Sequence, residues 1–246
     1  MKGKSLYVVG IGPGRYEDMS IKAAKVLNGC DEIVGYTVYC DLVRPWFSDK
    51  KFISTPMMKE EERVRLALSE SDSGKKVALI CSGDAGIYGL LGLVYEMGRQ
   101  FPEVEIRVAT GVTAAISGGA VLGAPLVHDF CLISLSDRLT PFELIEKRLR
   151  LAAQGDFVIV IYNPESKSRK GFLKKACEIL IDEIGDERVC GIARNVGRDG
   201  EDYRVMSLAE LRDTPADMFS TVFIGNASTK SIDGRMVTAR GYSSER

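Results

Sequence analysis

The sequence has little of what marks metalloproteins and membrane proteins. It contains one histidine, His128, and its six cysteines include no Cys-x-x-Cys pair. That pattern argues against a zinc or iron–sulfur site, so no metal cofactor is expected. No apolar run has the length of a membrane span, and the first residues lead into an apolar segment without the hydrophobic core of a signal peptide. We therefore expect a cytoplasmic protein with reduced cysteines and no membrane partner.

The chain also lacks an excess of charge of either sign. It has 33 Lys and Arg against 34 Asp and Glu, and its formal net charge is −1 at pH 7. Proteins that bind nucleic acid through its phosphates carry a surplus of basic residues, so nucleic acid is not an expected partner. With 246 residues, of which 45% are hydrophobic, the chain can bury one large core or two smaller cores.

Strand and helix patterns alternate along most of the chain. The strand candidates are continuous apolar runs, which are typical of a parallel sheet covered on both faces by helices. A pause near Gly123 and Pro125 predicts a boundary between an N-terminal α/β lobe, residues 1–125, and a C-terminal mixed α/β lobe, residues 126–246. The tail from Gly234 reads as irregular. The main strand candidates are Ser5–Val9, Glu32–Gly35, Lys51–Ser54, Val77–Ile80, Glu105–Val108, Cys131–Leu135, Asp156–Ile161 and Thr221–Ile224.

A glycine-rich turn, Cys81–Gly89, follows one of these strands and precedes a helical pattern. In open α/β sheets ligands bind at the carboxyl ends of the strands, where glycine lets the backbone approach them closely. Asp84 adds one carboxylate to this turn. Local chemistry leaves two interpretations open, a ligand-binding turn and a structural turn in which Asp84 caps the next helix.

A second glycine loop, Gly10–Gly14, also lies between a strand and a helix, but its spacing is wrong for a dinucleotide fingerprint. No Gly-Lys-Ser/Thr follows it, which excludes a P-loop, and the chain has no Gly-x-Ser-x-Gly elbow. With these motifs excluded, the sequence suits a group-transfer reaction in which backbone groups do most of the binding. Methyl transfer from S-adenosylmethionine is one such reaction, because the sulfonium already activates the methyl group. Composition alone does not select that reaction.

Several motifs, taken together, resemble the tetrapyrrole methylase family over essentially the whole chain. They are Val9–Gly14, Ser82–Asp84, Gly111–Ala115 and Gly123–Leu126. Further strings resemble the branch that methylates C-17 of precorrin-3B or cobalt-precorrin-3 in cobalamin biosynthesis, and Ala85, where other branches commonly have proline, points the same way. These strings are Gly83–Gly89, His128–Phe130, Ile133–Asp137, Leu139–Pro141, Ile161–Pro164 and Met236–Thr238.

The resemblance implies a two-lobed α/β fold and a homodimer. It also implies that S-adenosylmethionine lies in a cleft between the lobes, with S-adenosylhomocysteine as product, and that a tetrapyrrole binds beside it. By position, the cofactor contacts would be Ser82, Gly83, Asp84, Ile87, Thr113, Ala114, Asn163, Val196 and Ala227. The first glycine loop, including Gly12, Pro13 and Gly14, would line the tetrapyrrole site.

The same branch is linked to contraction of the macrocycle, which requires proton transfers. Imidazole is the side chain that ordinarily titrates near neutral pH, so His128 is the first candidate for a general acid or base. The alternative is a hinge histidine that hydrogen-bonds to the backbone. Asp129, Asp84 and Tyr162 are weaker candidates for the same role.

A precorrin carries acetate and propionate groups, for which arginine is the natural partner. Arg194 and Arg198 are the leading candidates to bind them, although the residue types and positions favour a solvated surface role for each over a ligand contact. The segment Ser166–Lys170 could also face the substrate, or could be an exposed helix start.

Two other functions remain open at this point. One is a sibling methylase that acts on another ring carbon or on a protein side chain, and the other is a tetrapyrrole carrier without turnover. The sequence does not reveal whether the acceptor already contains cobalt. Thr110 and Ala239 stand where relatives commonly have proline, so the local backbone path could differ there.

Overall fold

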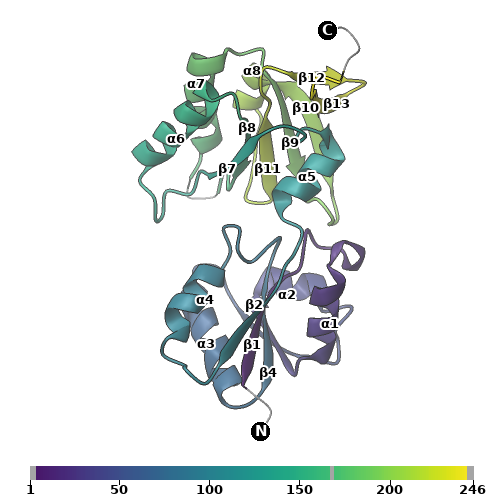
Figure 1. Ribbon diagram of the computed structural model, residues 1–246, viewed down its shortest axis with the longest axis vertical. Coiled ribbons are helices and arrows are strands. Elements are labelled where there is room, and N and C mark those ends of the chain that lie inside the picture. Colours follow the sequence, from purple (N-terminus) through teal and green to yellow (C-terminus); the bar gives the residue numbers. More distant parts are fainter. Residues whose placement is uncertain (1–3, 167–168, 243–246) are drawn as a thin grey trace. The chain divides into compact units, whose positions relative to one another are not determined.

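The computed structural model describes residues 4–166 and 169–242, and the chain forms two compact units, Met1–Thr113 and Ala114–Arg246 (Figure 1). This division precedes the boundary after residue 125 that the sequence suggests. The reason is that helix α5, Ala114–Leu122, packs on strands of the second unit. No helix within the described ranges has the length and hydropathy needed to span a bilayer.

The first unit is built on a five-stranded sheet with the order β3-β2-β4-β1-β5, in which all neighbours are parallel. Helices connect successive strands, which confirms the expected parallel α/β architecture. The strands are β1 Ser5–Gly10, β2 Glu32–Tyr36, β3 Lys51–Thr55, β4 Lys76–Cys81 and β5 Glu105–Ala109; the helices are η1 Tyr16–Asp18, α1 Ile21–Gly29, α2 Thr37–Val43, α3 Glu60–Asp72 and α4 Leu91–Gly98.

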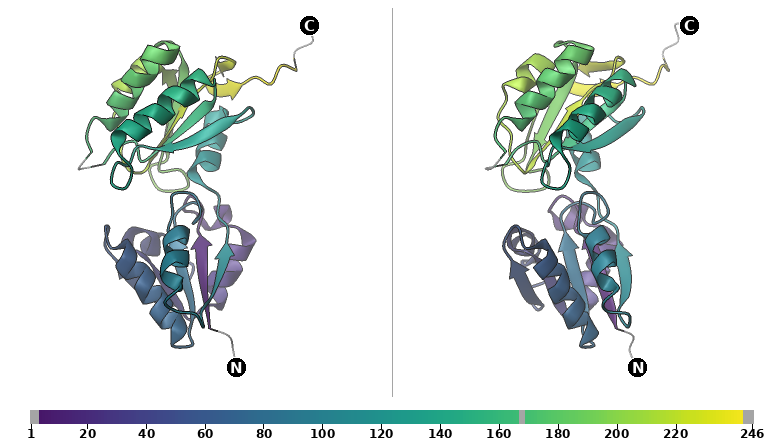
Figure 2. Two further views of the ribbon diagram at one scale, coloured as in Figure 1. Left: turned by 60° about the vertical axis from the view of Figure 1, so that its left-hand side comes forward. Right: turned by 90° about the vertical axis from the view of Figure 1, so that its left-hand side faces the viewer.

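The continuous apolar strands of this unit contribute side chains to two separate hydrophobic cores, one on each face of the sheet. Helices cover both faces of the sheet (Figure 2). Side chains alternate between the faces of a strand, so Leu6 and Val8 of β1 pack with α3 and α4, whereas Val9 packs with α1 and α2. In β4, Leu79 and Ile80 divide in the same way. A strand buried on both faces therefore needs an unbroken apolar run, which is the pattern read in the sequence.

The second unit has a mixed five-stranded sheet with the order β10-β9-β11-β8-β7. Strand β7 is parallel to β8, while β11 is antiparallel to both β8 and β9, and β10 is antiparallel to β9. The strands are β7 Phe130–Ser134, β8 Val158–Tyr162, β9 Val189–Arg194, β10 Asp202–Ser207 and β11 Ser220–Ile224; the helices besides α5 are α6 Phe142–Gln154, α7 Phe172–Ile184 and α8 Leu208–Arg212.

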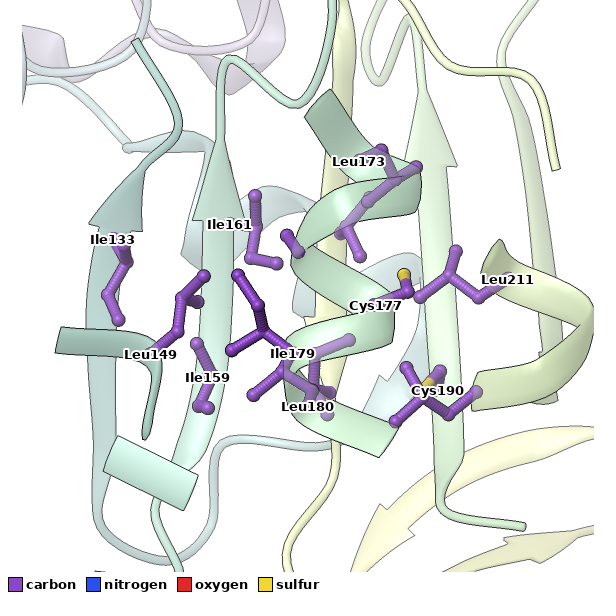
Figure 3. Packing of buried hydrophobic residues seen from close by; sticks show 14 of the residues in the cluster. Ile133, Leu149, Ile159, Ile161, Leu173, Cys177, Ile179, Leu180, Cys190 and Leu211 are labelled. Atoms are coloured by element: carbon purple, nitrogen blue, oxygen red, sulfur yellow. The ribbon is translucent and has the colours of Figure 1, made fainter. Parts of the chain in front are cut away.

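Helices cover both faces of the second sheet. Side chains of β7, β8 and α7 interdigitate in the larger core, which also includes α6 and α8 (Figure 3). On the other face α5 lies against Phe223, and a Cβ added to Gly118 would come within 3.0 Å of that ring. Glycine at this position therefore allows the helix to approach the sheet closely.

Part of the tail expected to be irregular is a strand, whereas residues 239–242 form neither helix nor strand. Strand β13, Arg235–Thr238, pairs with β12, Thr229–Ile232, and with β6, Gly123–Ala124. The expectation overlooked a local signal, because Asp-Gly is typical of a two-residue hairpin turn, and Asp233 (φ +49°) and Gly234 (φ +74°) connect β12 to β13. The pairing of β13 with β6 joins segments far apart in the sequence, which no local pattern shows.

Candidate functional site

The carboxyl ends of β1, β4 and β5 meet backbone to backbone in the first unit. Gly12 and Gly83 form a reciprocal pair, with N–O distances of 3.1 and 2.8 Å. A Cβ on Gly111 would lie 2.1 Å from the carbonyl oxygen of Gly83, and a Cβ on Gly10 would lie 2.6 Å from the same oxygen. No side chain fits at either position, so the three loops can approach only as glycine backbone.

The side chain of Asp84 connects the turn after β4 to the loop after β5 through hydrogen bonds. Its Oδ1 accepts the N–H of Gly86 at 2.8 Å, and its Oδ2 accepts the N–H of Gly111 at 2.9 Å, in the loop after β5. Helix α4 starts later, and its N-cap Leu90 makes no side-chain cap hydrogen bond. Asp84 is therefore not a cap of α4. In this geometry its carboxylate positions the two loops that carry the expected cofactor contacts.

The turn after Asp84 presents apolar side chains above this glycine backbone. Ile87 and Tyr88 are exposed, and Tyr88 has φ +52°, a conformation that costs free energy for a bulky residue. Ser82 and Gly83 lie at the base of the turn and are half-buried. Ser82, Gly83, Asp84 and Ile87, for which the resemblance implies cofactor contact, lie in this one turn.

The first glycine loop is hydrogen-bonded to this turn rather than separate from it. Gly12 has φ +70°, and a Cβ there would lie 2.8 Å from the carbonyl oxygen of Asp18. Gly12, Pro13 and Gly14 are all buried. A loop expected to line the tetrapyrrole site and a turn expected to hold the cofactor are therefore direct neighbours in the first unit.

In the second unit, the carboxyl ends of β7, β8 and β9 lie at one edge of the sheet, because β11 runs antiparallel to both β8 and β9. We call this edge, with Ser134, Tyr162, Asn163 and Val196, the carboxyl edge. The N-terminus of α5 lies at the same edge, because the hydroxyl of Tyr162 accepts the N–H of Ala115 at 2.8 Å.

Asn163 belongs to a chain of polar side chains at the carboxyl edge. It has φ +52°, and its Nδ2 donates to Oγ of Ser134 at 3.0 Å. The same Oγ accepts the N–H of Ser136 at 3.2 Å, and Oγ of Ser136 in turn accepts Nη1 of Arg169 at 3.3 Å. The sequence predicted no site role for either serine, although Ser134 ends strand β7, which runs parallel to β8, and Ser136 follows it.

Arg194 is bound by a carboxylate of the chain itself. Its Nε and Nη2 both lie 2.8 Å from Oδ2 of Asp217. Burial opposes ionisation of Asp217, but the hydrogen bond from Arg194 and those from neighbouring groups lower the pKa of this carboxyl below its ordinary value. Arg198 lies with its guanidinium carbon 5.6 Å from the centre of the Phe219 ring. The ion pair leaves Arg194 less suited to bind a substrate carboxylate.

Three of the expected site residues lie at the opposite edge of the second sheet. The carbonyl of Asp129 accepts the N–H of Val158, the first residue of β8, and the N–H of Ala227 donates to Oδ1 of Asp156 at 2.8 Å. Strand β8 has five residues, so this edge is roughly 16 Å from Tyr162 and Asn163. The structure therefore does not bring His128, Asp129 or Ala227 together with the carboxyl edge.

His128 matches the alternative interpretation better. Its side chain is exposed, and Nδ1 accepts the backbone N–H of Asp129 at 2.9 Å. Nδ1 also lies 3.9 Å from Oδ2 of Asp129. A histidine that binds the backbone at a turn before β7 needs no catalytic role to account for its position.

Neither thiols nor metal-binding clusters contribute to the site. Burial raises the pKa of the Cys81 thiol, at the end of β4, to about 11, so the group is neutral at physiological pH. Among residues 4–166 and 169–242, no three or more His, Cys, Asp or Glu side chains form a group that could hold a metal ion.

Several known proteins are similar to this chain over almost its whole length. A relative from Salmonella typhimurium, named probable cobalt-factor III C(17)-methyltransferase, is 44% identical over 238 residues, which are 96% of this chain and 99% of the relative. A precorrin-3B C(17)-methyltransferase from Sinorhizobium sp is 38% identical and covers 93% of this chain and 91% of the relative. The crystal structure of the methyltransferase CobJ matches with a TM-score of 0.87 at 37% identity, over 95% of this chain and 99% of that one.

The family model for tetrapyrrole (corrin/porphyrin) methylases matches residues 5–212, which reach from β1 to the end of α8. The matched segment includes the glycine loops of the first unit and the carboxyl edge of the second. The chain therefore belongs to the tetrapyrrole methylase family.

Proposed function

We propose that this protein transfers a methyl group from S-adenosylmethionine to C-17 of a precorrin-3B or cobalt-factor III type macrocycle in cobalamin biosynthesis. The observation that carries the proposal is the pair of relatives that align over almost their whole lengths and are both named C(17)-methyltransferases. Their names differ in the acceptor, with and without cobalt, so the proposal covers both. We also propose that the reaction is linked to ring contraction and that the protein is a homodimer.

The chain offers a suitable place for the cofactor. S-adenosylmethionine, when bound, supplies a methyl group activated by its sulfonium. The glycine loops of the first unit leave backbone amides and carbonyls close together, where an added Cβ would collide, beside the exposed apolar side chain of Ile87. Backbone groups with a few apolar contacts are typical of a nucleoside site. We assign Ser82, Gly83, Ile87, Thr113, Ala114, Asn163 and Val196 to cofactor contact.

Two side chains next to these contacts, those of Asp84 and Tyr162, position the backbone that carries them. Asp84 orients the loops after β4 and β5, and Tyr162 orients the first turn of α5. Methyl transfer depends strongly on alignment of donor and acceptor, so small displacements of these loops lower the rate. Of the three catalytic candidates in the second unit, only Tyr162 lies at the carboxyl edge, and we propose it as the group nearest to any proton transfer.

The test is an anaerobic incubation of the purified protein with S-adenosylmethionine and either precorrin-3B or cobalt-factor III, followed by mass spectrometry and absorbance spectra. A product heavier by one methylene from one acceptor supports the proposal and identifies the acceptor. Methylation at another ring carbon, located by NMR of a product made with a labelled methyl group, indicates a sibling methylase instead. Tight binding of the tetrapyrrole with no binding of S-adenosylhomocysteine indicates a carrier. Light scattering on the eluting protein tests the dimer.

A further inference from the structure

Arg169 stands at the carboxyl edge of the second unit with most of its donors unused. It lies in the segment between β8 and α7, and its side chain is half-buried. Its Nη1 donates to Oγ of Ser136 at 3.3 Å, a long hydrogen bond. Its Nε is buried and has no hydrogen-bond partner among residues 4–166 and 169–242. A guanidinium carries five N–H donors, so much of its capacity remains available.

No carboxylate of the described residues pairs with Arg169. Within residues 4–166 and 169–242, no ion pair includes Arg169, whereas Arg194 at the same edge is bound by Asp217. Glu165, close in sequence, accepts the backbone N–H of Gly171 at 2.9 Å through Oε1. An unpaired buried donor destabilises a folded chain, and such groups are often explained by a ligand.

The position of Arg169 relates it to the expected cofactor contact. Ser136 and Ser134 link its guanidinium to Asn163 through three hydrogen bonds of 3.3, 3.2 and 3.0 Å. The two serine hydroxyls hold the segment after β7 against the segment after β8. Through these hydrogen bonds the Arg169 guanidinium lies near Asn163, which we assign to cofactor contact, at the edge where ligands of α/β sheets bind.

We propose that Arg169 and Ser136 form a binding site for a carboxylate, and that this carboxylate is a peripheral acetate or propionate of the tetrapyrrole acceptor. The proposal rests on the proposed function, since that function supplies an acceptor with several carboxylates. A planar guanidinium binds carboxylates with two parallel hydrogen bonds, which a lysine cannot reproduce. The alternative source of the same chemistry is the α-carboxylate of S-adenosylmethionine.

The test compares Arg169→Gln and Arg169→Lys with Arg148→Gln, which removes the same charge from an exposed position on α6. Binding of each acceptor is measured by anaerobic absorbance titration in the presence of S-adenosylhomocysteine, and binding of S-adenosylhomocysteine alone by calorimetry. We expect Arg169→Gln to weaken acceptor binding by about 10- to 100-fold. Arg169→Lys should recover part of this loss, and the affinity for S-adenosylhomocysteine should stay at the parent value in every variant.

Three results would overturn the proposal. If Arg169→Gln weakens S-adenosylhomocysteine binding and not acceptor binding, the carboxylate belongs to the cofactor. If Arg169→Gln binds both ligands like the Arg148→Gln control, Arg169 has no ligand-binding role. If the parent protein binds S-adenosylhomocysteine but neither acceptor, the proposed function itself fails, and the carboxylate site fails with it.

Discussion

Asp84 and Tyr162 act on the same short stretch of chain, Gly111–Ala115. Asp84 accepts the N–H of Gly111 at one end, and Tyr162 accepts the N–H of Ala115 at the other. Both are polar side chains that bind backbone donors, and this use of a side chain is common at loops and helix starts. Thr113 and Ala114, the expected cofactor contacts, lie between the two anchors.

We expect Asp84→Ala to lower the free energy of unfolding of the first unit by about 2 kcal/mol, because two N–H groups lose a charged acceptor. Binding of S-adenosylhomocysteine should weaken by about tenfold or more, and Asp84→Asn, which keeps an acceptor oxygen, should fall between the parent and Asp84→Ala. Urea unfolding and calorimetry give the two quantities. Unchanged values for both in Asp84→Ala would show that the two hydrogen bonds contribute little.

Tyr162→Phe should keep the fold and weaken S-adenosylhomocysteine binding a few-fold. The ring remains packed while the N–H of Ala115 loses its partner, and loss of a helix N-terminal acceptor costs about 1 kcal/mol. The matched control is Tyr95→Phe, an exposed tyrosine on α4 of the first unit. A full loss of activity with unchanged cofactor affinity would instead assign Tyr162 a role in proton transfer.

In the second unit, the packing of helix α5 and the directions of the strands determine which loops lie near each other. Gly118 lets α5 pack against Phe223, and Leu122 at the end of α5 packs in the same cluster. The direction of each strand decides which edge its loops reach. Strand β11 is antiparallel to β8, so the loop after β11 reaches the edge where β8 begins.

Gly118→Ala should destabilise the second unit by about 1–3 kcal/mol, because the new Cβ lies 3.0 Å from the Phe223 ring and overpacks the core. Intrinsic helix propensity favours alanine, so the sign of the effect separates packing from propensity. The control is Gly92→Ala in α4, where a Cβ meets no atom within 4 Å. There we expect a gain of about 0.5–1 kcal/mol in the free energy of unfolding.

His128→Ala should leave the methylation rate within about twofold of the parent, since an exposed side chain roughly 16 Å from Tyr162 has no path to the reacting atoms. Single-turnover rates measured across pH 6 to 8, the ordinary range of imidazole titration, provide the test. A tenfold loss, or a changed pH profile, would return His128 to the mechanism.

The molecule as a whole consists of two units, each with cores of its own. The clusters that include α1 to α4 draw on the first unit, and those that include α5 to α8 draw on the second. The chain has a single tryptophan, Trp46, which lies in the first unit. Tryptophan fluorescence therefore reports on the first unit, while circular dichroism reports on both.

Because the cores are separate, Gly118→Ala should shift part of the circular dichroism transition to lower urea concentration and leave the Trp46 fluorescence transition in place. The parent protein and Gly92→Ala serve as references. Gly92→Ala should shift the unfolding transition of the first unit, which Trp46 fluorescence follows, and leave the transition of the second unit in place. If both probes shift together in Gly118→Ala, the two units unfold as one cooperative system.

Much of the candidate site could be read from the residues themselves. The turn at Ser82–Asp84 and the loop at Gly12 were expected to bind ligands, and the structure brings them into direct contact. The network through Ser134 and Ser136 could not be read in the same way, because serine after a strand is common and only tertiary pairing shows which serines meet. Arg194 was expected to face the substrate, and its ion pair with Asp217 depends on a contact between distant segments.

By itself the sequence determined the alternation of strands and helices and the parallel first sheet, because hydrophobic periodicity is a local property of the chain. The family was recognised from the resemblance of several motifs, and the family model confirms it. The tertiary structure alone decided which loops share an edge. His128 and Ala227 lie at one edge of the second sheet and Asn163 at the other, because that outcome depends on strand direction. Strand direction follows from long-range pairing, which a local pattern does not encode.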